Sequence, residues 1–258
     1  MNDMTTRFPS ASSVQWTAGQ PKVLASGVRA PSDPGLASRA RGDREKRRMP
    51  ELLNLFHAHA FEQHFQPDST LLLHGDPADA IYLVVSGTVR CCTIDGHGRR
   101  QIFAFPKKGA CVGISGSDFW HFTAEAVDHV IVKSMPRAIL EQELAVNVTL
   151  RQEVRAHVRD LLAERERQLL MLSTTNGPQR LFHFLEGFAA TRASTGFVVL
   201  PMCRRDIADH IGLSTEGVSR AFSTLKRKGL IELKSSERYR MTGNSLAGPA
   251  SPANPAHV

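Results

Sequence analysis

The stretch "CRRDIADHIGLSTEGVSRAFSTLKRKGLI", residues 203–231, decides the fold of the C-terminal part of the chain. Two segments, each long enough for a short helix, flank Gly212, which tolerates the positive φ of a tight turn. Small and apolar side chains occupy the positions where two such helices must touch: Ile207, Ala208, Ile211, Leu213, Val218 and Ala221. This pattern predicts a helix-turn-helix.

Three polar side chains share the outer face at the start of the second predicted helix. Glu216, Ser219 and Arg220 are spaced i, i+3 and i+4, so they project from the same side. Arg can pair with guanine, Glu can accept from cytosine, and Ser can bond either base of an A·T pair in a major groove. For Glu216, the alternative is an ordinary carboxylate that favours a helix N-terminus.

Basic residues flank the predicted reading face. Arg204 and Arg205 precede the first helix, and Lys226, Arg227 and Lys228 lie further along the second. At these places, contact with phosphate is expected rather than base readout.

The net charge of +7 is unevenly distributed. Residues 1–48 hold nine Lys/Arg against four Asp/Glu, residues 49–175 hold twelve against fifteen, and residues 176–258 hold eleven against six. A basic C-terminal third joined to a mildly acidic middle suggests that a module for double-stranded DNA is attached to a domain with another task.

Changes in composition and periodicity divide the chain into five parts. Residues 1–48 form a basic tail with the composition of disorder, residues 49–136 a glycine-punctuated β-roll, and residues 137–175 a long helix. Residues 176–242 form the helix-turn-helix with a β-hairpin, and residues 243–258 a second disordered tail. The predicted fold class is therefore α+β: an N-terminal roll, a dimerisation helix and a C-terminal winged helix-turn-helix.

The long helix carries a narrow apolar stripe between charged faces. Its members are Leu150, Val154, Val158, Leu161, Leu162, Leu169 and Leu172. A stripe of this length predicts a parallel homodimer seam. The alternative is packing against the chain's own roll.

Other classes of protein find little support in the sequence. No apolar run in the sequence is close to the 18 or more consecutive residues of a membrane span, and the N-terminal residues lack the apolar core of a secretory signal peptide. We therefore expect a cytoplasmic protein without a membrane partner. Four cysteines at irregular spacing form no disulfide framework. No nucleophile–base pair, metal-ligand spacing or phosphate loop is present, and we expect neither an enzyme nor a metal site.

Together, the stretch "GDPADAIYLVVSGTVRCCTIDGHGRRQIFAFPKKGACVG" and the later "TEGVSRAF" resemble the roll and recognition helix of the CRP/FNR family of bacterial transcription regulators. Glu216, Ser219 and Arg220 match the E-x-x-S-R pattern with which its FNR and FixK branches read TTGAT half-sites. The resemblance implies a homodimer on TTGAT-N4-ATCAA-like palindromes, RNA polymerase as a partner, and micro-oxic, nitrogen-fixation or denitrification genes as targets. Gly217 departs from the pattern, at a cost of up to about 1 kcal/mol in helix propensity.

The ligands of other branches of the family are not expected in this chain. In "CVGISGSDFWHFTAEA" Gly113 is retained, but no arginine lies between Arg100 and Arg137 to pair with a cyclic phosphate. No cysteine precedes Cys91, which argues against an iron–sulfur cluster, and we expect no cofactor. A haem-based sensor of nitric oxide or oxygen remains the rival interpretation, with His57, His59 and His64 available as ligands.

The fourth cysteine is a candidate redox site. Cys203 precedes Arg204 and Arg205 at the expected start of a helix, an environment that favours the thiolate. Oxidation there would add negative charge close to DNA phosphates. The alternative is an inert small residue at the end of a strand. Cys91, Cys92 and Cys111 are expected to be packing residues of the roll.

Overall fold

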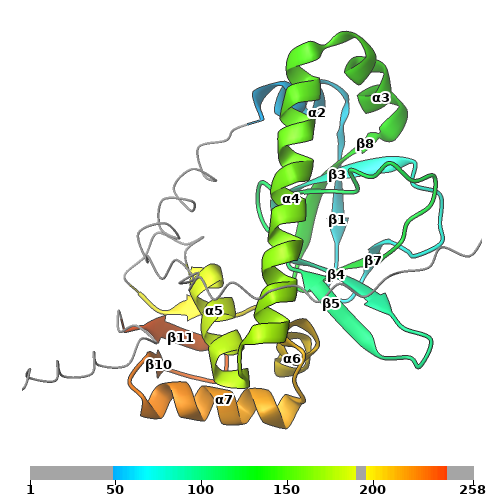
Figure 1. Cartoon of the computed structure of the whole chain (residues 1–258). Coiled ribbons are helices and arrows are strands. Elements are labelled where there is room, and N and C mark those ends of the chain that lie inside the picture. The colour runs from blue at the N-terminus through cyan, green and yellow to red at the C-terminus, as the bar shows by residue number, and fades with distance from the viewer. Residues whose placement is uncertain (1–48, 190–195, 243–258) are drawn as a thin grey trace, which may run out of the picture. The chain divides into compact units, whose positions relative to one another are not determined.

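The computed structural model describes residues 49–189 and 196–242 (Figure 1). The two tails predicted at residues 1–48 and 243–258 lie outside this range. No helix of the described residues is long and apolar enough to cross a membrane.

The N-terminal part of the described chain is a roll of two four-stranded antiparallel sheets. One sheet has the order β1-β8-β3-β6 and the other the order β2-β7-β4-β5. The strands are β1 (Phe61–Phe65), β2 (Thr70–Leu72), β3 (Ala80–Ser86), β4 (Val89–Ile94), β5 (Arg100–Ala104), β6 (Cys111–Val112), β7 (Thr123–Ala126) and β8 (Val130–Pro136). Their alternating side chains fill the core of the roll with residues such as Val84, Val89, Trp120 and Val132.

Three helices adjoin the roll. Helix α2 (Pro50–His59) has proline in its first turn and buries Leu52, Leu55 and Phe56. Helix α3 (Arg137–Val146) follows β8, and helix α4 (Val148–Thr174) is the long helix.

The sequence analysis predicted one helical segment over residues 137–175, but the structure contains a break at Asn147. The backbone of Asn147 is extended, with φ −95° and ψ 105°, and its side chain accepts a hydrogen bond from the amide of Leu150. Asparagine is among the strongest N-cap residues. It therefore ends one helix and begins the next without glycine or proline.

The C-terminal part is a three-helix unit with a small sheet. It comprises α5 (Gly177–Ala189), β9 (Val198–Val199), α6 (Arg204–Ile211), α7 (Thr215–Arg227), β10 (Ile231–Leu233) and β11 (Arg238–Met241), with sheet order β10-β11-β9. Tyr239 is fully buried in its core, and its hydroxyl donates to the carbonyl of Leu185 at 2.6 Å. This bond ties the hairpin to α5.

The turn between α6 and α7 provides a test of backbone strain. Gly212 ends α6 with φ 66°, a conformation that costs a residue with a Cβ roughly 1–2 kcal/mol. Gly212→Ala should therefore lower the free energy of unfolding by about 1 kcal/mol in urea titrations.

Gly187→Ala is the matched control, because Gly187 is exposed in α5 and an added Cβ meets nothing within 4 Å. It should stabilise the protein by about 0.5–1 kcal/mol. The same sign for both changes would contradict the assignment of strain to Gly212.

Candidate nucleic-acid interface

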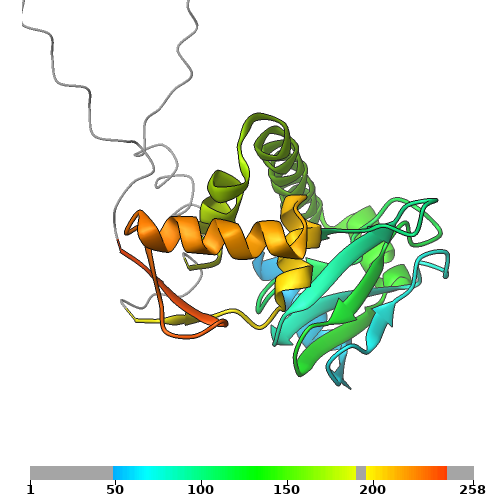
Figure 2. The same ribbon diagram turned by 90° about the horizontal axis from the view of Figure 1, so that it is seen from below.

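The predicted helix-turn-helix is confirmed: α6 and α7 are consecutive helices (Figure 2), and Gly212 lies between them in the sequence. Ser214 is the N-cap of α7, and its hydroxyl accepts from the amide of Gly217 at 3.0 Å. Gly217 thus lies in the first turn, where part of its low helix propensity is offset by this cap. The inner faces of the two helices bury Ile207, Ile211 and Val218.

The three predicted base-reading residues lie together on the exposed face of α7. Glu216, Ser219 and Arg220 are each exposed, and Glu216 is in the first turn of the helix. The hydroxyl of Ser219 donates to the carbonyl of Thr215 at 3.1 Å, which leaves its oxygen able to accept from a base or a water. The structure brings the three residues to one face, and base readout remains a prediction.

Four of the five predicted phosphate-contacting residues are exposed: Arg205, Lys226, Arg227 and Lys228. Arg204 is placed differently. Its guanidinium stacks on the ring of Phe222, 3.3 Å from the centroid, and donates to the carbonyl of Ser236 at 2.6 Å. Burial lowers the pKa of Arg204 to about 10. This side chain ties α7 to the hairpin rather than projecting toward a ligand.

The hairpin adds basic residues that the sequence analysis did not select. Lys234 and Arg238 are exposed on the β10–β11 hairpin, and Arg240 pairs with Glu232 across it. Their signal in the sequence was the alternation of "IELKSSERYRM", in which apolar residues face the core and basic residues face out. They extend the basic surface beyond the two helices.

The apolar stripe of α4 has a buried part and an exposed part. The predicted dimer seam is therefore shorter than the sequence analysis gave it. Leu150 and Val154 are 1% and 9% exposed and pack in the chain's own core with residues of α2 and α3. The sequence analysis assigned both to the dimer seam, but they are unavailable to a partner. Further along the helix, a second set is exposed: Val158, Leu161, Leu162 and Leu169. Leu172, half-buried, approaches the helix-turn-helix turn at Gly212.

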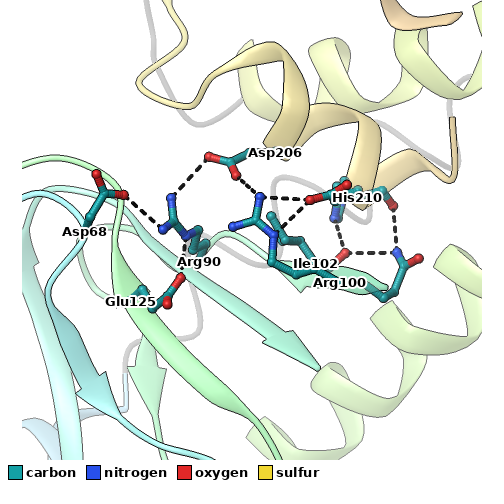
Figure 3. Close-up of polar contacts among 9 residues, drawn as sticks. Asp68, Arg90, Arg100, Ile102, Glu125, Asp206 and His210 are labelled. Atoms are coloured by element: carbon teal, nitrogen blue, oxygen red, sulfur yellow. Dashed lines mark hydrogen bonds and ion pairs between the residues drawn. The ribbon is translucent and has the colours of Figure 1, made fainter. Parts of the chain in front are cut away.

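The face of α6 opposite the reading surface packs on the roll through charged side chains. Asp206 is buried and accepts from Arg100 of β5 and, at 3.4 Å, from Arg90 of β4 (Figure 3). Asp209 accepts from Arg100 at 2.8 Å. The sequence analysis did not select this network. The sequence offered one sign of it: Asp206 and Asp209 place two carboxylates three residues apart in the first helix of an otherwise basic helix-turn-helix.

His210, one turn further along α6, completes this contact. Its Nδ1 lies 3.1 Å from the carbonyl of Ile102. The side-chain amide nitrogen of Gln168 in α4 lies 3.4 Å from the same Nδ1. The ring contacts Phe105 and Phe184, and burial lowers the pKa of His210 to about 4.

The four cysteines are all free, and only Cys203 is exposed. It is the N-cap residue of α6. Burial raises the pKa of Cys91 and of Cys111 to about 12, and Cys92 is also buried. Thiolate chemistry at the three roll cysteines is therefore disfavoured, whereas oxidation at Cys203 remains a prediction.

The segment of the roll that follows Gly113 is packed on itself. Trp120, from the same stretch as Gly113, folds back over it, so that a Cβ at Gly113 would lie 2.8 Å from the indole. The indole is buried in the core of the roll beside Phe122. With this segment packed on itself and without an arginine, no cation from it faces a cyclic phosphate.

The histidines that could have ligated haem lie at the surface. His57 and His59 are exposed on α2, and His64, also exposed, contacts Glu62 on β1. Within residues 49–189 and 196–242, no group of three or more metal-ligating side chains is found.

Comparisons with known proteins agree with this architecture. The cyclic nucleotide-binding domain family matches residues 62–147, and the Crp-like helix-turn-helix domain family matches residues 179–242. Nitrogen fixation regulation protein FixK of Azorhizobium caulinodans is 33% identical over 70% of this chain and 75% of that protein. Transcriptional activator protein FnrA of Stutzerimonas stutzeri is 29% identical over 65% of this chain and 71% of that protein. The solved structure of FixK2 from Bradyrhizobium japonicum is 31% identical, with a TM-score of 0.69 over 71% of this chain and 92% of that one.

A roll, a long helix and a winged helix-turn-helix define a DNA-binding transcription regulator. The chain belongs to the CRP/FNR family and resembles its FixK branch.

The buried imidazole gives stability a specific pH dependence. The pKa of His210 is lowered from 6.5 to about 4, so between these values the unfolded chain binds the proton and the folded chain does not. Stability is therefore fully present above pH 6.5 and falls as the pH drops through this window. From pH 7 to pH 5, wild type should lose about 2 kcal/mol more unfolding free energy than His210→Gln.

Urea titrations at the two pH values measure this difference. His183→Gln, at an exposed position of α5, is the control and should lose as much stability as wild type. An acid loss in His210→Gln equal to that of wild type would show that other groups control the pH dependence.

Proposed function

We propose that the protein is a transcription activator that binds TTGAT-N4-ATCAA-like palindromes as a homodimer. The observation that carries this proposal is the placement of Glu216, Ser219 and Arg220 on the exposed face at the start of α7. The three residues retain the E-x-x-S-R spacing, and their donors and acceptors suit base edges in a major groove. RNA polymerase is the proposed protein partner.

A palindrome requires two reading helices related by a two-fold axis. The exposed part of the α4 stripe can supply that axis, because Val158 and Leu169 are 45% and 67% exposed. Apolar side chains at this spacing would be covered by the same stripe of a second copy. The proposed seam is therefore limited to Val158, Leu161, Leu162, Leu169 and Leu172.

The names of the relatives support a role in oxygen-limited metabolism. They include FixK, a nitrogen fixation regulation protein, and the anaerobic regulatory protein of Haemophilus influenzae. We therefore propose micro-oxic, nitrogen-fixation or denitrification genes as targets of this chain.

The readout proposal distinguishes Arg220 from Lys226. Arg220→Ala should weaken binding to the palindrome by roughly 1–3 kcal/mol with little change on scrambled DNA. Lys226→Ala should weaken binding to both duplexes alike and reduce the slope of affinity against salt. Fluorescence anisotropy with the two duplexes at several salt concentrations measures both effects. Equal losses on the two sequences for Arg220→Ala would show that this residue contacts only phosphate.

The dimer proposal is tested by charges in the exposed stripe. Val158→Glu combined with Leu161→Glu should give monomers that lose binding to the palindrome, because two carboxylates would meet their copies across the seam. Gln152→Glu combined with Ala163→Glu adds the same charge at exposed positions on another side of α4 and should leave the dimer intact. Light scattering and anisotropy measure the two properties. A monomer that binds the palindrome as tightly as wild type would contradict the proposal.

A further inference from the structure

The contact between α6 and the roll centres on one carboxylate. Asp206 has a side chain only 3% exposed, and its two oxygens accept from different arginines, one from Arg100 and one from Arg90. Arg100 also pairs with Asp209, one turn along α6. Figure 3 shows both guanidiniums projecting from the roll toward α6. We name these four residues the ionic latch.

Arg90 of the latch is held from the roll side as well. The Nε of Arg90 donates to Glu125 of β7 at 2.7 Å, and another of its nitrogens donates to Asp68 at 2.9 Å. Both partners belong to the roll. A guanidinium fixed by two such bonds presents its remaining donor to Asp206 in one direction, because the guanidinium is planar and rigid.

Aromatic packing lies beside the latch, whose Asp206 and Arg90 side chains are themselves only 3% and 12% exposed. The ring of Phe105, after β5, contacts the rings of His210 and of Phe184 in α5. The ammonium of Lys107 lies over the ring of Phe188 of α5, 3.0 Å from its centroid. Charge pairs in such surroundings are poorly screened by salt, so the latch differs from a surface ion pair.

Buried ion pairs specify geometry more effectively than they add stability. Desolvation offsets most of their attraction, whereas loss of one partner leaves an unpaired buried charge. An alternative orientation of α6 on the roll would leave Asp206 without Arg100. The latch therefore penalises orientations other than the one in the structure.

The latched protomer leaves the surfaces needed for DNA binding open. The reading residues of α7 are exposed, and so are Val158 and Leu169 of the proposed seam. None of these exposed residues takes part in the latch. It therefore fits a competent arrangement and does not mask the site.

We infer that the ionic latch is a positioning device that holds the helix-turn-helix on the roll in its DNA-binding orientation without a bound ligand. The inference rests on the proposed binding to a palindrome. Orientation matters most when two half-sites must be reached at once, because the spacing of the two reading helices then has to match that of the DNA. A single half-site does not impose this requirement.

Arg100→Met tests the inference against a matched control, Arg99→Met. Each change removes one positive charge from neighbouring positions of the chain, but Arg99 is 79% exposed and pairs with Asp95 in the adjoining turn. Arg100→Met should weaken binding to the full palindrome about tenfold or more relative to Arg99→Met. Binding to a duplex with one half-site should differ less than about twofold between the two variants. Arg100→Lys, which retains the charge, should restore most of the affinity for the palindrome.

A second measurement does not depend on DNA. Spin labels at Glu62→Cys and Ser223→Cys, both exposed positions, report the distance between the roll and α7 in a Cys203→Ser background. An excess of unlabelled protein suppresses signals between subunits. The distance distribution should be narrow with Arg100 and broad with Arg100→Met.

Each outcome of the two measurements has a distinct meaning. A distribution for Arg100→Met as narrow as that of wild type would overturn the latch, as would equal losses on the palindrome and the half-site. If wild type does not prefer the palindrome, the proposed function fails while the distance measurement still decides the latch. If Arg100→Met does not fold, Asp209→Asn replaces it, because this change removes only the outer partner of Arg100. Asp209→Asn should broaden the distance distribution between the spin labels. A distribution as narrow as that of wild type would overturn the inference.

Discussion

A buried carboxylate imposes a strict requirement on the structure around it. The side chain of Asp206 is only 3% exposed, and donors from Arg100 and Arg90 meet its two oxygens. Those donors come from two strands of the roll, far away in sequence, while Asp206 belongs to the first helix of the helix-turn-helix. Asp206 thus joins two parts of the chain, and the aromatic packing around His210 lies beside the same contact.

The sequence predicted the elements that depend on local rules. The helix-turn-helix followed from the glycine turn and from the apolar positions on its inner faces. The reading face followed from helical spacing, because once Val218 and Ala221 are buried, Glu216, Ser219 and Arg220 must lie outside. The roll followed from short alternating runs between glycines. In each case the decisive residues lie within a few positions of one another.

The features that the sequence did not reveal depend on contacts between distant segments. The stripe of α4 looked uniform, yet Leu150 and Val154 are covered by α2 and α3 whereas Val158 and Leu169 are not. In the sequence, Arg204 was indistinguishable from its neighbour Arg205 as a phosphate contact. In the structure, its guanidinium stacks on the ring of Phe222 and donates to a carbonyl of the hairpin. Periodicity identifies which residues share a face, and it does not identify what covers that face.

The exposed stripe of α4 also affects how the quantity of protein relates to its action. For a protomer that pairs through this stripe, the concentration of dimer rises with the square of the protomer concentration when the protein is scarce, because association follows mass action. A modest increase in synthesis would then produce a steeper than proportional increase in occupied sites. In such a pairing, the amount of protein present sets the response more steeply than in proportion.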